Sequence, residues 1–182
     1  TPSFEGCEGD SQTFTITVNP TPTIEDIDQE ICTGSGISIT PTVGTIPAGT
    51  TYSWDAPTSS PLGAITGGTS GTNETIIAES ELLNSTNSPA ILTYSVTPTT
   101  PDGCTSSDPF IVSVTVNPTG QVDAIDSQIL CNTDETELIS FSTQNTGGTT
   151  TYTWTNDTPG IGLALSGTGD ISPFNVVNNG NE

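Results

Sequence analysis

The chain has 182 residues, and its 21 Asp and Glu are accompanied by no Lys, Arg or His, so the formal net charge is -21. No His or Lys is available as a general base near neutral pH, no Lys can form a Schiff base, and no Arg can clamp a phosphate or carboxylate. The negative charge also repels nucleic acid and anionic lipid. Composition therefore argues against an enzyme, a nucleic-acid binder and a protein inserted in a membrane.

The sequence repeats itself with a period of about 97 to 100 residues, the length of one immunoglobulin-sized sandwich. Residues 14–20 (Phe-Thr-Ile-Thr-Val-Asn-Pro) return at 112–118 as Val-Ser-Val-Thr-Val-Asn-Pro, and Tyr52-Ser-Trp54 returns as Tyr152-Thr-Trp154. Gly6-Cys7 likewise matches Gly103-Cys104, and Ile31-Cys32 matches Leu130-Cys131.

We expect three units from this repeat. Residues 1–20 are the last part of one repeat, residues 21–118 are a whole repeat, and residues 119–182 are about two thirds of a third. Counterparts of the strands predicted at 91–97 and 110–116 are absent from this third unit. Because the chain is out of phase with its own repeat, we interpret it as an internal segment of a longer protein.

Within residues 21–118 the predicted elements, in chain order, are short strands separated by turn clusters. Apolar residues alternate at 37 and 39, at 52 and 54, at 92, 94 and 96, and at 110, 112, 114 and 116. The stretch 73–83 could form a helical turn, but we predict a strand at 75–78 followed by a loop. About seven short strands predict an all-β fold of tandem Ig-like antiparallel β-sandwich repeats.

Trp54 and Trp154 allow two interpretations. An indole on the third strand of a sandwich fills the space between two sheets about 10 Å apart, whereas a sugar-stacking platform would need an exposed ring. Because Tyr52 lies on the same face as Trp54, we predict that the indole belongs to the core.

Several of these motifs together resemble a known family. The motifs are Val-Asn-Pro at the end of one repeat, Cys32-Thr-Gly34 some twelve residues later, a Tyr-x-Trp motif, and Asp102-Gly-Cys104 before a last alternating strand. They are similar to the PKD-like, Ig-like repeats of very large Bacteroidota surface proteins. Residues 161–169 resemble the middle segment of that family, whereas Cys131-Asn-Thr lacks the glycine of the Cys-x-Gly motif. Such repeats occur in gliding-motility adhesins of the SprB type, exported by the type 9 secretion system.

The four cysteines fit an oxidising, extracellular location. One pair per repeat suggests a bond between Cys32 and Cys104, with Cys7 and Cys131 bonded to residues outside the segment. A simple Ig-like topology places Cys32 and Cys104 at opposite ends of the sandwich, so their bond requires residues 21–31 to be mostly linker. Bonds between neighbouring repeats and free thiols stay open as alternatives.

Acidic residues follow both Asn-Pro boundaries. Glu25, Asp26, Asp28 and Glu30 follow the first, and Asp123 and Asp126 follow the second. Carboxylates at a junction can bind Ca²⁺, and Asp26, Asp28, Asp123 and Asp126 are the candidate ligands, although acidic linkers are usually only solvated. We otherwise expect no cofactor and no catalytic residue.

The resemblance implies a structural role at the bacterial cell surface. We expect a stalk segment of a long extracellular adhesin filament for attachment or gliding, whose partners are neighbouring repeats and other surface or secretion proteins, with no nucleic acid and no membrane insertion. The alternative is a carbohydrate-binding module of a secreted glycan-degrading protein.

Overall fold

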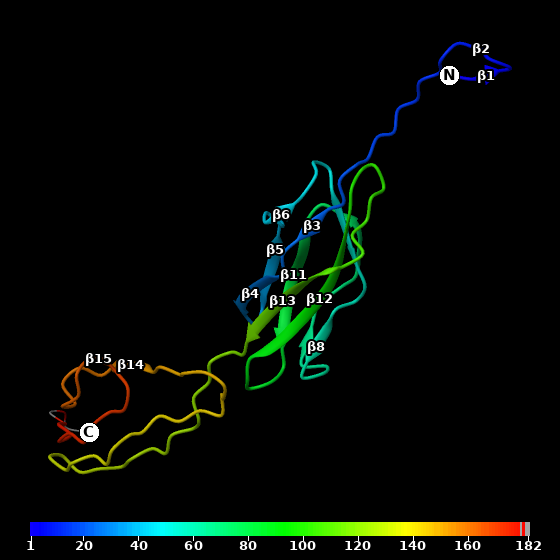
Figure 1. Ribbon diagram of the computed structural model, residues 1–182. Helices are drawn as coiled ribbons and strands as arrows, with labels where there is room; N and C mark the ends of the chain where they lie inside the picture. Colours follow the sequence, from blue (N-terminus) through cyan, green and yellow to red (C-terminus); the bar gives the residue numbers. More distant parts are fainter. Residues whose placement is uncertain (179, 181–182) are drawn as a thin grey trace.

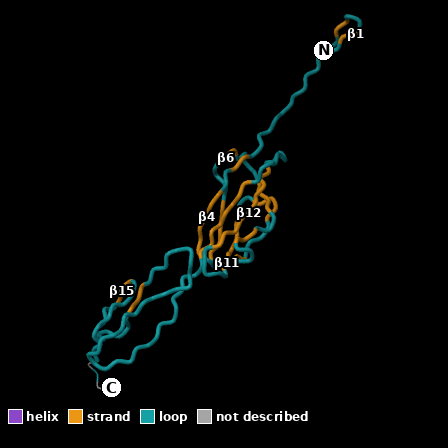
Figure 2. Tube along the Cα trace, turned by 60° about the horizontal axis from the view of Figure 1, so that its bottom comes forward, coloured by secondary structure: helices purple, strands orange, loops and turns teal. Residues whose placement is uncertain are grey.

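The computed structural model describes residues 1–178 and 180, and it has strands and no helix among them, which confirms the predicted all-β class. Figure 1 shows three parts along one long axis: a small N-terminal hairpin on an extended linker, a central sandwich, and a C-terminal unit of mostly irregular backbone. The two chain ends lie at opposite ends of the molecule in both views (Figures 1 and 2).

The larger sheet of the sandwich has six strands. Its order is β10 (Gly71–Glu74), β7 (Thr51–Trp54), β12 (Ala90–Thr99), β13 (Phe110–Asn117) and β4 (Ile27–Cys32), and β8 (Thr58–Ser60) also pairs with β12. The pairing of β13 with β4 is parallel, and the other pairs are antiparallel. The long strands β12 and β13 therefore occupy the middle of the sheet.

The second layer consists of β5 (Ser35–Ile39), β11 (Ile77–Asn84) and β9 (Ile65–Thr66), with the small pair β3 (Thr23–Ile24) and β6 (Gly44–Thr45) beside it. Every second residue of β12 and β13 faces this layer, as expected for a strand with one buried face. The core between the layers joins Tyr94, Val96, Val112 and Val114 to Ile37, Ile39, Ile77 and Leu82.

The prediction for residues 73–83 was wrong. The structure has β10 and then a continuous strand, β11, where we expected a short strand and a loop. The register of β11 against β5 shifts between Glu79 and Leu82, so both side chains point inward although they are three residues apart. A β-bulge of this kind breaks the period of two, which is why the sequence resembled a helical turn.

Residues 21–31 also differ from a linker, because they contain β3 and β4, and β4 pairs with β13 along its whole length.

The two ends of the chain lack a comparable core. Residues 1–21 are all exposed, although they form a small hairpin of β1 (Ser3–Phe4) and β2 (Cys7–Glu8). In the C-terminal unit, β14 (Thr153–Thr155) pairs with β15 (Ser166–Thr168), and two isolated bridges join 135 to 175 and 139 to 171. Among the described residues after 118, only Thr136 is buried.

Each tryptophan lies against a glycine of the neighbouring strand. Gly71 of β10 is the register partner of Trp54, and a methyl group added at Gly71 would overlap the indole ring. Gly167 of β15 has the same relation to Trp154. Only glycine leaves space for the ring at these positions.

Gly71→Ala is therefore expected to push the indole of Trp54 out of its position and to lower the free energy of unfolding of the sandwich by about 2 kcal/mol. Urea unfolding followed by tryptophan fluorescence measures this change. Gly120→Ala is the matched control, since an added methyl there meets open space. Equal stability of the two variants would show that the ring tolerates displacement.

Candidate functional site at the joint after the sandwich

A buried asparagine at the end of β11 orders the loop that follows it. The Asn84 Nδ2 donates to the carbonyl oxygens of Ser88, at 2.8 Å, and Val116, at 2.7 Å. The Asn84 Oδ1 accepts from the backbone N–H and the hydroxyl of Thr86. All hydrogen-bonding groups of this amide are thus used to fix residues 85–89 against the end of β13.

The ordered loop contacts the C-terminal unit directly. The Thr146 N–H donates to the carbonyl oxygen of Asn87 at 2.8 Å, and the hydroxyls of Ser88 and Thr146 lie 2.6 Å apart. Asn145 Nδ2 donates to the carbonyl oxygens of Thr119, at 3.1 Å, and Asn87, at 3.4 Å, and its Oδ1 accepts from the Gln121 N–H at 3.0 Å. Asn145 therefore bonds both the loop and the linker.

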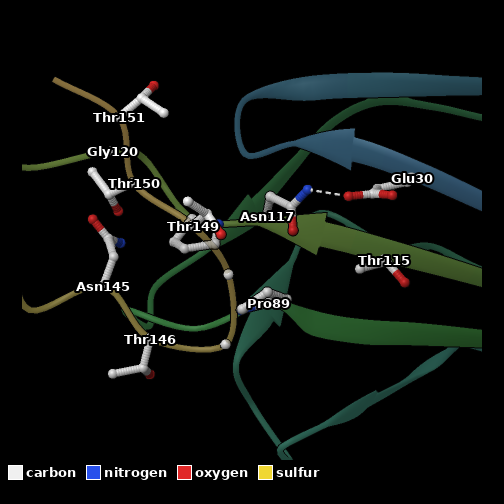
Figure 3. Close-up of a pocket in the computed structure, with 13 residues that line it drawn as sticks. Glu30, Pro89, Thr115, Asn117, Gly120, Asn145, Thr146, Thr149, Thr150 and Thr151 are labelled. Atoms are coloured by element: carbon white, nitrogen blue, oxygen red, sulfur yellow. Dashed lines mark hydrogen bonds between the residues drawn. The ribbon is translucent and has the colours of Figure 1, made fainter. Parts of the chain in front are cut away.

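The linker itself is anchored on the sandwich. Asn117 Nδ2 donates to Glu30 Oε1 at 2.6 Å, as Figure 3 shows, and the Asn117 carbonyl accepts from the Thr33 N–H at 2.8 Å. Pro118 follows, and its ring fixes one backbone angle of the linker. The two hydrogen bonds of Asn117 and the ring of Pro118 thus restrict the direction in which the chain leaves the sandwich.

These contacts surround a hollow of about 660 Å³ (Figure 3). Pro89 and Thr115 line it on the sandwich side, and residues 145–151 line it on the other side. Glu30 is its only ionisable lining residue among those described, and the remaining polar groups are amides, hydroxyls and backbone. Such a set offers neutral hydrogen bonds that hold two units together, and it offers no acid-base pair for catalysis.

The structure does not bring Cys32 and Cys104 together, which corrects the expected pairing. Cys32 lies opposite Asn117 at one end of β13, whereas Cys104 lies in the turn before the other end of that strand. An eight-residue strand separates its ends by roughly 20 Å, and a disulfide needs Cα atoms within about 7 Å. All four cysteines, including Cys7 and Cys131, are free. Bonds between successive repeats stay a prediction, which this placement at opposite ends favours.

The four candidate calcium ligands are used separately. Asp26 Oδ1 accepts from the Ile111 N–H at 2.7 Å, and Asp123 Oδ2 accepts from the Ser142 hydroxyl at 2.8 Å, while Asp28 and Asp126 are exposed. Glu25, Asp26 and Asp28 line a hollow of about 320 Å³. Within residues 1–178 and 180, however, no three His, Cys, Asp or Glu are grouped so that they could hold a metal ion.

Trp54 belongs to the core, as predicted. Its side chain is 7% exposed, its Nε1 donates to the Thr69 carbonyl at 2.8 Å, and its ring makes a T-shaped contact with the ring of Tyr94. Trp154 is half-buried, and its Nε1 donates to the Gly169 carbonyl at 3.1 Å. The indole of Trp54 therefore does not present the open ring face that a sugar platform needs.

Sequence reasoning missed a buried carboxylate, Glu79. Its oxygens accept from the Thr69 N–H at 2.7 Å, the Thr69 hydroxyl at 3.0 Å and the Tyr94 hydroxyl at 3.3 Å. Because β11 carries Glu79 and β12 carries Tyr94, this network joins the two sheets. Burial, and then the charge and the hydrogen bond of Glu79, raise the pKa of Tyr94 above its usual value of 10.0. The bulge of β11 hid this residue from a period-two pattern.

The raised pKa of Tyr94 predicts a loss of stability in alkali. Above about pH 10 the unfolded chain releases the tyrosine proton while the folded chain keeps it, so the free energy of unfolding falls as pH rises toward the folded pKa. We expect a decrease of about 1 kcal/mol between pH 8 and pH 11. Urea unfolding at each pH measures this decrease. The cysteine thiols are alkylated so that they do not titrate, and the chain has no Lys that would titrate in this range.

Tyr94→Phe should remove most of that decrease and leave the part due to Tyr52, whose pKa burial also raises. An unchanged alkaline loss in this variant would assign the effect to another group.

No part of the described chain forms a helix with the length and apolar character needed to cross a membrane. A search of the curated proteins found no match.

The family model of the PKD-like domain matches residues 29–120, which run from β4 through β13 to the linker. Domains of this family are Ig-like sandwiches, typically extracellular and non-catalytic. The match covers the core of the sandwich, the loop ordered by Asn84 and the anchored linker, and it confirms the resemblance at the level of the family. The chain belongs to the PKD-like domain family.

Proposed function

We propose that this chain is a segment of tandem sandwich repeats in a long protein of the bacterial cell surface, where it acts as a stalk. In this proposal residues 1–20, 21–118 and 119–182 belong to three successive repeats. The stalk holds an adhesive region away from the cell, for surface attachment or for gliding as in the SprB-type adhesins. Its own contribution is length and stiffness.

The observation that carries the proposal is the hydrogen-bonded joint. A flexible tether between domains would need only exposed, unpaired residues. Here Asn145 bonds both the loop at Asn87 and the linker at Thr119 and Gln121, and Asn117 bonds Glu30. These contacts resist bending, which is the property that a stalk requires.

The charge supports the same role. Repeats that carry only negative side chains repel one another along the chain and between neighbouring chains. A filament built from them stays extended and does not collapse on itself. In this proposal the acidic residues at the surface of the sandwich keep the filament extended by repulsion, without binding a ligand.

The carbohydrate-binding alternative gains no support from the tryptophan of the complete sandwich. Trp54 is buried and its N–H is bonded within the chain, so it cannot stack on a sugar without unfolding the core. Micromolar binding of a polysaccharide to the sandwich would nevertheless favour that alternative over the stalk.

Asn145→Ala is expected to loosen the joint, because it removes hydrogen bonds worth about 1 kcal/mol each to residues 87, 119 and 121. Small-angle scattering should then show a broader distribution of interatomic distances at the largest separations, with the unfolding temperature of the sandwich unchanged.

The neighbouring exposed residue provides the control, since Gln144→Ala leaves those three hydrogen bonds in place. Identical scattering from the wild-type chain and both variants would mean that the joint is already mobile, and the stalk proposal would lose its main support.

A further inference from the structure

The two cysteines of the complete sandwich mark its two ends. Cys32 is the last residue of β4, opposite Asn117, where the chain leaves toward the C-terminal unit, and its side chain is exposed. Cys104 is half-buried in the turn between β12 and β13, at the end that faces the N-terminal hairpin (Figure 1). We call the end at Cys104 the proximal end of the sandwich and the end at Cys32 its distal end.

The turn that carries Cys104 has a fixed place at the proximal end. The Cys104 N–H donates to the Thr100 hydroxyl at 3.1 Å, and the Thr100 N–H donates to the Cys104 carbonyl at 2.9 Å. In the strand order β7-β12-β13-β4, this turn lies between the beginnings of β7 and β4. The turn before β7 touches it, because a methyl group added at Gly49 would lie 2.8 Å from the ring of Pro101.

The C-terminal unit presents its own proximal end to the sandwich. Residues 145–151 precede β14 as residues 47–50 precede β7, and each turn has a glycine in the left-handed region, Gly147 and Gly49. A methyl group added at Gly147 would lie 3.0 Å from the ring of Pro89, which directly precedes β12 at the distal end of the sandwich. The joint is therefore a contact between the distal end of one repeat and the proximal end of the next.

Cys32 lies on the side of β4 that faces this joint. Glu30 and Cys32 share one face of β4 because they are two residues apart, and Glu30 lines the hollow at the joint (Figure 3). Residues 145–151 and Gly120 line the other side of the hollow. These segments precede the counterparts of β7 and β4, and between β7 and β4 the sandwich carries the turn with Cys104. A cysteine in that turn of the following repeat thus lies across the joint from Cys32.

We propose that a disulfide crosses each joint, between the distal cysteine of one repeat and the proximal cysteine of the next. Cys32 bonds to the following repeat and Cys104 to the preceding one, so the bonds form a ladder along the stalk. This inference rests on the proposed function, since it needs tandem repeats. It also agrees with the four free thiols of this chain, because no bond of the ladder joins two of them.

Each bond of the ladder forms by thiol–disulfide exchange. One S–S bond replaces two S–H bonds, and the two electrons and two protons pass to the disulfide of a thiol oxidoreductase in the cell envelope, which becomes a dithiol. The hydrogen bonds of Asn145 resist bending at the joint. A disulfide beside them also resists pulling the two repeats apart, because it does not break without a reductant.

The intact surface protein, prepared without reductant and with its free thiols alkylated, tests the pairing. A protease that cuts after aromatic residues releases Cys32 in residues 15–52 and Cys104 in residues 95–110. Mass spectrometry should find each peptide bonded to a peptide from a neighbouring repeat, and reduction should separate them. Alkylated Cys32 and Cys104, or residues 15–52 bonded to residues 95–110, would overturn the ladder and leave the stalk standing. An intact protein without further repeats would refute the stalk and the ladder together.

Two serine variants of the intact protein distinguish the ladder from a bond within one repeat. In Cys32→Ser, Cys104 should stay bonded and one thiol should become free in the following repeat. In Cys104→Ser, Cys32 should stay bonded and one thiol should become free in the preceding repeat. Ser106→Ala, two residues beyond Cys104, is the control and should free no thiol. A free Cys104 thiol in Cys32→Ser would contradict the proposal.

Discussion

Burial of the inner face of β12 and β13 is the interaction on which the rest of this fold depends. Tyr94, Val96, Val112, Val114 and Val116 are 0% exposed, and their strands occupy the middle of the six-stranded sheet. Each such side chain stabilises the fold by about 1.5 to 3 kcal/mol before the cost of ordering the chain, and the net stability of a typical domain is only about 5 to 15 kcal/mol, so the loss of even one of them is a large fraction of the total. A chain without Lys, Arg or His has no side-chain ion pairs that could replace this burial.

The described residues of the C-terminal unit include no counterpart of that hairpin. The unit repeats the tryptophan against its glycine and the hydrogen bond at Val176, yet its apolar side chains stay half-exposed. The described residues of this unit thus show local pairing together with apolar side chains that are not closed into a core. The joint at Asn145 still holds this open unit against the sandwich through neutral hydrogen bonds. Stiffness between units and closure within a unit are thus separate properties of the chain.

The sequence was informative wherever the period of two is regular and much less so elsewhere. The alternation in residues 110–116 and the pair Tyr52 and Trp54 correctly predicted buried strand faces in an all-β fold. The bulge in β11 could not be predicted, because it places Glu79 and Leu82 on the same face although a regular period of two would place them on opposite faces. The hydrogen bond between Glu79 and Tyr94 was missed for the same reason. The joint was equally hidden, because its hydrogen bonds use backbone carbonyls and common polar side chains such as Asn145 that no motif distinguishes.

Hydrogen exchange of the dilute whole chain tests most directly whether the β12–β13 hairpin closes a unit. We predict that amides of β7, β11, β12 and β13 exchange only through unfolding of the whole sandwich, and that amides of β14 and β15 exchange at least a hundredfold faster, although β14 repeats the sequence motif of β7. Equal protection of β7 and β14 in a monomeric sample would contradict this dependence on the hairpin, because a unit without it would then be as stable as the complete sandwich.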